Sequence, residues 1–169
     1  MTKWLYCPEC RAELDGSGEF AKCPKGHFVK YNTPVISAFG FFEFDGKYLF
    51  MKRDYRPRKG FWSVPAGFLE NNETAEEGLA REAKEEANID IDISKLEYIG
   101  SFYQEYGDKY GTKNVGIGYK YRFDALPKIE LNDEHSDYLW ATLDDAPEIA
   151  STDVRDALEY LQNKLSKMV

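Results

Sequence analysis

The chain has 169 residues, of which 43% are hydrophobic and 15% aromatic, enough for the packed core of one full domain with a small appendage. Its formal net charge of −8 argues against a general nucleic-acid-binding protein, because phosphates would be repelled rather than neutralised. No apolar run approaches the roughly 18 residues of a membrane-spanning helix and no signal peptide is apparent, so we expect a cytoplasmic protein with no membrane partner.

The cysteines all lie near the N-terminus, and their odd number favours a metal site over a disulfide framework. Cys7 and Cys10 have the spacing of a zinc knuckle, and Cys23 with His27 offers a second pair. We therefore predict a structural, four-coordinate Zn²⁺ site in a zinc ribbon at residues 1–31. Assigning His27 as the fourth ligand is an inference from the spacing, and a ribbon that has lost its metal is the alternative.

A larger domain is predicted at residues 35–169, after a linker that ends at Pro34. Strand-like runs at 38–44 and 47–53 flank Asp45-Gly46, the preferred pair for a type I′ hairpin turn. A loop at 54–60 and a strand at 61–64 follow. Gly67 is then expected in a tight turn that precedes a helix.

That helix is predicted to begin at Ala75, because Thr74 and Glu77 can form a capping box. It should end where Asn88 takes the left-handed C-terminal position. Three glutamates then share one face of the helix: Glu82, Glu85 and Glu86. Like charges at this spacing repel one another, so a hard divalent cation is their natural occupant.

The remaining elements complete a layered fold. Strands are predicted at 96–103, 115–123 and 137–141, and a C-terminal helix at 152–168 has an apolar stripe that begins at Val154. Strands on both sides of a central helix, with a second helix at the end, predict an α+β fold, an α/β/α sandwich on a mixed sheet.

The segment from Gly67 to Ile89 resembles the Nudix box, G-x5-E-x7-R-E-U-x-E-E-x-G-U, where U is aliphatic. The matching polar positions are Gly67, Glu73, Arg81, Glu82, Glu85 and Glu86. The chain departs at Ala83, a small aliphatic choice, and at Asn88, which replaces the last glycine but also tolerates the left-handed conformation. A glutamate-rich helix is otherwise often just a solvated face, but the fixed glycine and the upstream glutamate favour the box.

The resemblance implies a Nudix fold and hydrolysis of a nucleoside diphosphate linked to another moiety, with Mg²⁺ or Mn²⁺ as cofactor. It implies that Glu82, Glu85 and Glu86 hold the metal, and a backbone carbonyl in the expected turn at Gly67 could join them. Arg81 would orient the box by pairing with Glu73.

Relatives in this family often add a carboxylate six residues before a tryptophan, and Glu134 stands six before Trp140. We therefore nominate Glu134 as a fourth ligand or general base, with Asp133, Asp137 and Glu105 as rivals. His135 is expected to be a surface residue rather than a catalyst.

The ribbon resembles the zinc ribbon that precedes the Nudix domain in NADH pyrophosphatases. The candidate substrates are therefore nucleotide cofactors and their derivatives: NAD(H), FAD and ADP-ribose. Arg53 and Arg56 are candidates for binding phosphate or ribose, and Tyr103 and Tyr106 could either stack on a ring or fill the core. The segment after the box keeps Ser101 of the NADH pyrophosphatase pattern but lacks its prolines. The alternatives are a dinucleoside polyphosphate hydrolase and a non-catalytic nucleotide sensor whose ribbon contacts a partner. The resemblance also makes a homodimer reasonable.

Overall fold

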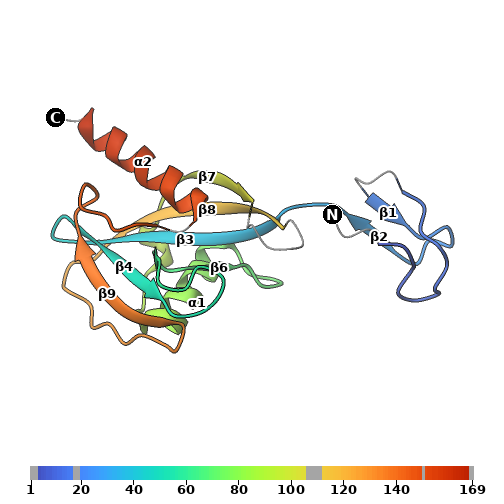
Figure 1. Cartoon of the computed structure of the whole chain (residues 1–169), viewed down its shortest axis with the longest axis horizontal. Helices are drawn as coiled ribbons and strands as arrows, with labels where there is room; N and C mark the ends of the chain where they lie inside the picture. The colour runs from blue at the N-terminus through green and yellow to red at the C-terminus, as the bar shows by residue number, and fades with distance from the viewer. Residues whose placement is uncertain (1–3, 17–19, 106–111, 150, 168–169) are drawn as a thin grey trace. The chain divides into compact units, whose positions relative to one another are not determined.

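The computed structural model describes residues 4–16, 20–105, 112–149 and 151–167 (Figure 1). The chain divides into two compact units, one that holds the residues up to Val35 together with Glu105–Lys113, and a larger one that holds Ile36–Gln104 and Asn114–Val169. Within the described ranges, no helix has the length and apolar character needed to cross a membrane.

The N-terminal unit is built around a small antiparallel sheet and two tight turns. Strands β1 (Phe20–Lys22) and β2 (Val29–Tyr31) pair with Phe20 opposite Tyr31. In the turns, the Arg11 amide donates to the Cys7 carbonyl and the Gly26 amide to the Cys23 carbonyl, each at 2.9 Å. Arg11 and Gly26 both have positive φ, at 59° and 79°. These turns bring the cysteines together.

The larger unit contains a mixed, seven-stranded sheet between two α-helices. Its core order is β5-β4-β3-β8-β7, with β6 added to β3 and β9 added to β4. The elements are β3 (Val35–Phe44), β4 (Lys47–Arg53), β5 (Trp62–Ser63), β6 (Ala66–Phe68), α1 (Ala75–Ala87), η1 (Ile93–Lys95), β7 (Glu97–Glu105), β8 (Lys113–Arg122), β9 (His135–Ala141) and α2 (Thr152–Ser166).

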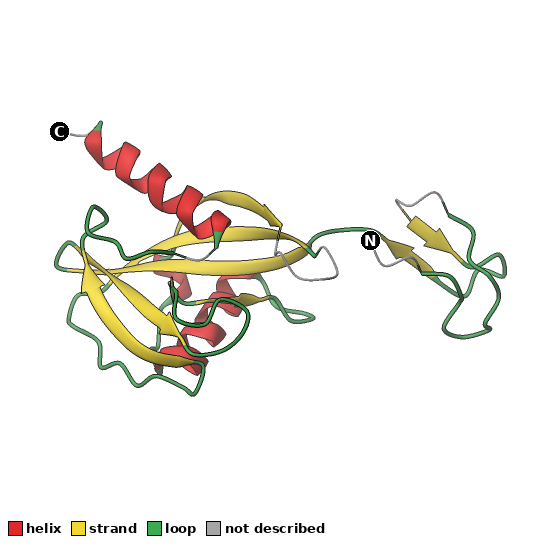
Figure 2. Ribbon diagram, viewed as in Figure 1, coloured by secondary structure: helices red, strands yellow, loops and turns green. Residues whose placement is uncertain are grey.

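Alternation along the central strands creates a core on each face of the sheet. In β4, Tyr48 and Phe50 belong to the cluster that includes α2, whereas Leu49 and Met51 belong to the cluster that includes Leu79 of α1. Successive side chains of a strand point to opposite faces, so α1 and α2 cover the two sides of the sheet. Figure 2 shows the two helices on opposite faces of the strands. The predicted α/β/α sandwich is confirmed.

The predicted turn between β3 and β4 is confirmed, but the predicted turn at Gly67 is not. Asp45 and Gly46 have φ of 50° and 74°, as a type I′ turn requires. Gly67 was expected in a tight turn, but it lies in strand β6, where it pairs with Ala38 of β3. That expectation was wrong because the pairing is between segments distant in sequence and leaves no local signal.

Helix α1 begins and ends at the predicted residues. The Thr74 side chain accepts from the Glu77 amide at 3.2 Å and the Glu77 carboxylate accepts from the Thr74 amide at 2.8 Å, completing the capping box. Asn88 adopts the left-handed conformation, with φ 54° and ψ 34°. Its side-chain amide also donates to Glu130 at 2.8 Å, an interaction that glycine at this position would lack.

Candidate active site and metal centres

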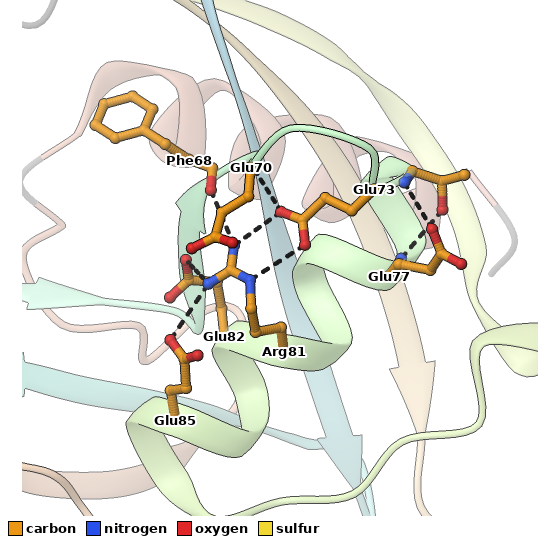
Figure 3. Close-up of polar contacts among 8 residues, drawn as sticks. Phe68, Glu70, Glu73, Glu77, Arg81, Glu82 and Glu85 are labelled. Carbon is orange, nitrogen blue, oxygen red and sulfur yellow. Dashed lines mark hydrogen bonds and ion pairs between the residues drawn. The ribbon is translucent and has the colours of Figure 1, made fainter.

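Arg81 is the organising cation of the glutamate-rich helix (Figure 3). Its Nε and Nη2 donate to the two carboxylate oxygens of Glu73 at 3.1 and 2.9 Å, so the predicted pair is bidentate. Nη1 donates to Glu82 at 2.7 Å and to Glu85 at 3.2 Å, and Nη2 also reaches the Phe68 carbonyl at 3.0 Å. One guanidinium therefore joins three carboxylates and strand β6.

Two glycines make room for these carboxylates. A Cβ added at Gly67 would lie 1.9 Å from Glu82 Oε1, so only glycine permits this approach of strand β6 to the helix. A Cβ at Gly78 would lie 2.9 Å from Glu73 Oε1. The predicted importance of Gly67 therefore has a steric basis, although a contact between its carbonyl and a metal stays a prediction.

Glu86 is a buried carboxylate next to other acidic groups. Glu86 is 4% exposed, and its Oε2 accepts a hydrogen bond from the Ala66 amide at 3.0 Å. Burial raises the pKa of Glu86 well above its usual range, and the negative charges of Glu82 and Glu134 add to this shift. Burial also raises the pKa of Glu82, which hydrogen bonds from Arg81 oppose. The arrangement has an excess of negative charge that a cation would relieve.

The residues present fit a hard divalent ion. Glu82 and Glu86 supply carboxylate oxygens on the inner side of α1, and oxygen is the ligand that Mg²⁺ and Mn²⁺ take in proteins. The Glu85 side chain is 58% exposed and lies at the outer edge of the group, held by Arg81. A cation bound here would compete with Arg81 for the oxygens of Glu82 and Glu85.

The loop that carries Glu134 is docked on the C-terminal end of α1. The Glu130 amide donates to the Ala87 carbonyl at 3.0 Å, and the Asn132 amide donates to the Glu86 carbonyl at 3.1 Å. The Glu134 amide then donates to Asn132 Oδ1 at 3.0 Å. Because helix carbonyls without intrahelical partners fix this loop, Glu134 is brought within electrostatic range of Glu82 and Glu86.

His135 is buried, contrary to the expectation that it is a surface residue. Its side chain has no exposed area, its Nδ1 lies 3.3 Å from Asn132 Oδ1, and its Nε2 lies 3.8 Å from Glu86 Oε1. Burial and the positive charge of Arg53 lower the pKa of His135 to about 4, so the ring is neutral at pH 7. Sequence reasoning missed this residue because its burial depends on the docking of the loop on α1, and its sequence neighbours are exposed polar residues.

The predicted substrate-binding residues lie on different elements. The Arg53 guanidinium lies 4.1 Å from the ring centroid of Tyr55, and its positive charge partly opposes the rise that burial causes in the pKa of the nearby Glu86. Arg56 is exposed in the loop that follows β4, whose last residue is Arg53. Tyr103 is 50% exposed on β7. Tyr106 lies outside the described residues.

Phe102 and Tyr103 are neighbouring aromatic residues on β7, and only Phe102 packs in the core. Its ring lies 5.9 Å from that of Phe39 and 6.5 Å from that of Tyr160 on α2, so it packs in the core. Tyr103, the next residue along the strand, points to the other face. Of these two neighbours, Tyr103 therefore has the more exposed ring.

A largely buried polar network, which no local pattern predicts, joins the loop at 54–60 to α2. Arg58 donates to Gln104 Oε1 at 3.4 Å, and the Gln104 amide donates to Asp153 at 3.0 Å. Asn114 donates to Ser37 at 2.9 Å and to Asp153 at 3.3 Å. Burial raises the pKa of Asp153. The network fixes the loop that carries Arg56, which begins just after Arg53 at the end of β4, to the sheet.

The N-terminal unit contains the predicted cluster of Cys7, Cys10, Cys23 and His27, whose ligand atoms all lie within 4.8 Å of one another. All three cysteines are free thiols, and Cys10 Sγ lies 3.6 Å from Cys23 Sγ. A tetrahedral zinc ion with bonds of about 2.3 Å separates its sulfur ligands by about 3.8 Å, so the spacing fits. A closed Cys3His site has no open position for chemistry, so zinc here would be structural.

Comparison with known proteins places this geometry in a family. The family model described as NUDIX domain matches residues 32–161. An ADP-ribose pyrophosphatase from Methanocaldococcus jannaschii is 42% identical over 66 residues, which cover 39% of this chain and 39% of that protein. The NAD-capped RNA hydrolase NudC of Vibrio vulnificus is 27% identical over 158 residues, which cover 90% of this chain and 56% of that protein. The chain thus spans between 39% and 56% of these two relatives.

A solved structure resembles the chain over almost its whole length. A NUDIX hydrolase from Nitrosomonas europaea matches with a TM-score of 0.68 and 27% identity, covering 92% of this chain and 88% of that one. The match to the family model includes the box, the Glu134 loop and most of α2. Because that model covers well over half of the sequence, the chain belongs to the Nudix domain family.

Proposed function

We propose that the chain is a divalent-metal-dependent pyrophosphohydrolase that cleaves the phosphoanhydride of a nucleoside diphosphate linked to another moiety. The observation that carries this proposal is the burial of Glu86 beside Glu82, within range of Glu134. Natural proteins rarely bury a carboxylate among like charges unless a cation is to be bound. We propose that the ribbon at 1–31 and the Nudix domain at 35–169 form separate domains, and that the protein acts in the cytoplasm.

The side chains would divide the work as follows. Glu82, Glu85 and Glu86 would hold Mg²⁺ or Mn²⁺, which when bound activates water and neutralises charge on the phosphate oxygens. Arg81 would position the carboxylates rather than contact substrate, because all its contacts are within the box. Glu134 would serve as a further ligand or as general base.

The substrate class is proposed from the relatives and from residues at the end of β4, in the loop after it, and on β7. The relatives named above are an ADP-ribose pyrophosphatase and an NAD-capped RNA hydrolase, so NAD(H), ADP-ribose and FAD are the leading candidates. Arg53 and Arg56 would bind the phosphates or ribose, since the Arg53 charge acts on the box. Tyr103 presents a half-exposed ring for stacking, and Tyr106 is proposed on sequence alone. A homodimer is proposed as well.

The direct test is a substrate panel with Mg²⁺ or Mn²⁺ that scores release of AMP or phosphate. The panel should hold NADH, FAD, ADP-ribose, a dinucleoside polyphosphate and an NAD-capped RNA. Glu85→Gln and Glu86→Gln should each lower turnover by at least about 10-fold. Glu159→Gln, at an exposed position of α2, is the matched control and should leave turnover unchanged.

Three results would change the assignment. Turnover that survives both box substitutions would reject these residues as the metal site. Binding of one nucleotide without turnover of any would support the sensor alternative, whose ribbon would then contact a partner. Cleavage of only the dinucleoside polyphosphate would favour the other alternative.

A further inference from the structure

We propose that Nε2 of His135 is an additional ligand of the box metal, so that the site combines nitrogen and oxygen donors. Such a centre would prefer Mn²⁺ or another first-row transition ion over Mg²⁺. This inference rests on the proposed function for the location of the metal. It goes beyond it because the box pattern contains no histidine and assigns none.

Hydrogen bonding fixes which nitrogen of His135 carries the proton. The Glu134 amide can only donate, and it meets Asn132 Oδ1 at 3.0 Å, so that atom is the acceptor oxygen of the side chain. His135 Nδ1 lies 3.3 Å from the same oxygen and must therefore be the donor. In the neutral ring, Nε2 then carries a lone pair.

That lone pair faces the free oxygen of Glu86. Glu86 Oε2 is engaged by the Ala66 amide at 3.0 Å, whereas Oε1 lies 3.8 Å from His135 Nε2. Nε2 is buried and has no hydrogen-bond partner among the described residues. At 3.8 Å the two atoms are too far apart to share a proton in a hydrogen bond, and two acceptors that face each other away from water are unfavourable unless a cation lies between them.

The separation suits a shared metal ion. Two ligands with metal bonds of about 2.1 Å can lie up to about 4.2 Å apart, and the 3.8 Å between Nε2 and Oε1 falls within that limit. Arg53 is the internal cation whose charge acts on both Glu86 and His135. Its guanidinium stacks on Tyr55 and donates to the Pro57 carbonyl at 3.4 Å, and no hydrogen bond in the described part of the chain joins it to Nε2 or Oε1.

The proposed donor set also sets the metal preference. Imidazole nitrogen suits Fe²⁺, Ni²⁺, Cu²⁺ and Zn²⁺ best, and Mn²⁺, although it also takes oxygen ligands, accepts nitrogen more readily than Mg²⁺, which is bound almost wholly by oxygen. Loss of His135 should therefore weaken binding of Mn²⁺ more than binding of Mg²⁺. A residue that only supports the fold would weaken both equally.

Electron spin echo spectroscopy of Mn²⁺ bound to the full, zinc-loaded chain can detect the nitrogen directly. The chain has two histidines, so His27→Gln leaves His135 as the only imidazole. We expect a ¹⁴N coupling in the wild type and in His27→Gln, and its replacement by a ¹⁵N coupling when histidine is ¹⁵N-labelled. His135→Asn, which can keep the bond to Asn132, should lose the coupling. It should bind Mn²⁺ at least about 10-fold more weakly, with Mg²⁺ affinity changed by less than about 3-fold.

The labelled His27→Gln protein decides the question even if His135→Asn does not fold. If Mn²⁺ binds without a histidine-derived coupling, His135 is not a ligand and the inference is overturned. If Glu86→Gln abolishes Mn²⁺ binding in that case, the carboxylate metal site of the proposed function still stands. An equal loss of Mn²⁺ and Mg²⁺ affinity in a folded His135→Asn protein would also overturn the inference. Failure of the wild type to bind Mn²⁺ at all would reject this inference together with the metal dependence of the proposed function.

Discussion

Replacing Arg81 by lysine tests whether one guanidinium organises the box. Lysine keeps the positive charge but replaces a planar fork by a single ammonium with three donors. The structure gives Arg81 five hydrogen bonds, two to Glu73 and one each to Glu82, Glu85 and Phe68. At least two of these must be lost in Arg81→Lys.

The size of the effect follows from those contacts. Hydrogen bonds to charged groups contribute roughly 1.5 kcal/mol each at the lower end, so two lost bonds reduce the free energy of unfolding by about 3 kcal/mol. The Arg81 side chain is 23% exposed and water will replace part of the loss, so about 2–3 kcal/mol is expected. In a domain of this size that corresponds to a fall in Tm of roughly 5–10 °C.

The assay is urea and thermal unfolding of wild type, Arg81→Lys, Glu73→Gln and the double variant, in buffer without Mg²⁺. If Arg81 and Glu73 act through each other, the double variant should be more stable than the sum of the single losses predicts, by about 1 kcal/mol or more. Additive losses, or an Arg81→Lys protein within about 0.5 kcal/mol of wild type, would refute the account of Arg81 as organiser.

Three further outcomes are expected. Gly67→Ala should fold but bind Mn²⁺ at least about 10-fold more weakly, because the new Cβ would occupy the space of the Glu82 carboxylate. Titration with Mn²⁺ measures this affinity, and an unchanged affinity would contradict the prediction. Without added metal, wild type should lose stability as the pH rises from about 4.5 through the raised pKa of Glu86, because the charged form is disfavoured only in the folded state. Melting curves at pH 5 and pH 8 should show a smaller loss in Glu86→Gln than in wild type, and equal losses would reject this explanation. Metal analysis should find about one zinc per chain in wild type and less in Cys23→Ser; absence of zinc from wild type would exclude the Cys3His site.

Features that depend on neighbours in the sequence could be predicted, and they include both ends of α1. The capping box of Thr74 and Glu77 and the left-handed Asn88 are set by local hydrogen bonds and backbone sterics. The hairpin at Asp45-Gly46 follows from the same kind of local rule. The pairing of Arg81 with Glu73 was inferred from family resemblance, and the structure shows its geometry.

Features that depend on contacts between distant segments could not be predicted. Gly67 lies in a strand because Ala38, 29 residues earlier, offers it a partner. His135 is buried because the residues before it bind to the carbonyl groups of Glu86 and Ala87. The network of Gln104, Asn114 and Asp153 combines three elements, and none of its members stands out locally. Periodicity reports which face of an element is apolar, but not which buried polar groups meet.

The docking of the 130–135 loop on α1 gives the departure from the box pattern at Asn88 a physical role. A glycine there would satisfy the left-handed backbone, but only a side chain can donate to Glu130, as Asn88 does at 2.8 Å. The same loop presents Glu134 to the carboxylates of α1 and places His135 against Glu86. The residue that ends the box helix and the residues proposed to complete the metal site are thus joined by a short series of hydrogen bonds. Metal selection in this chain is therefore expected to depend on residues outside the box as much as on the box itself.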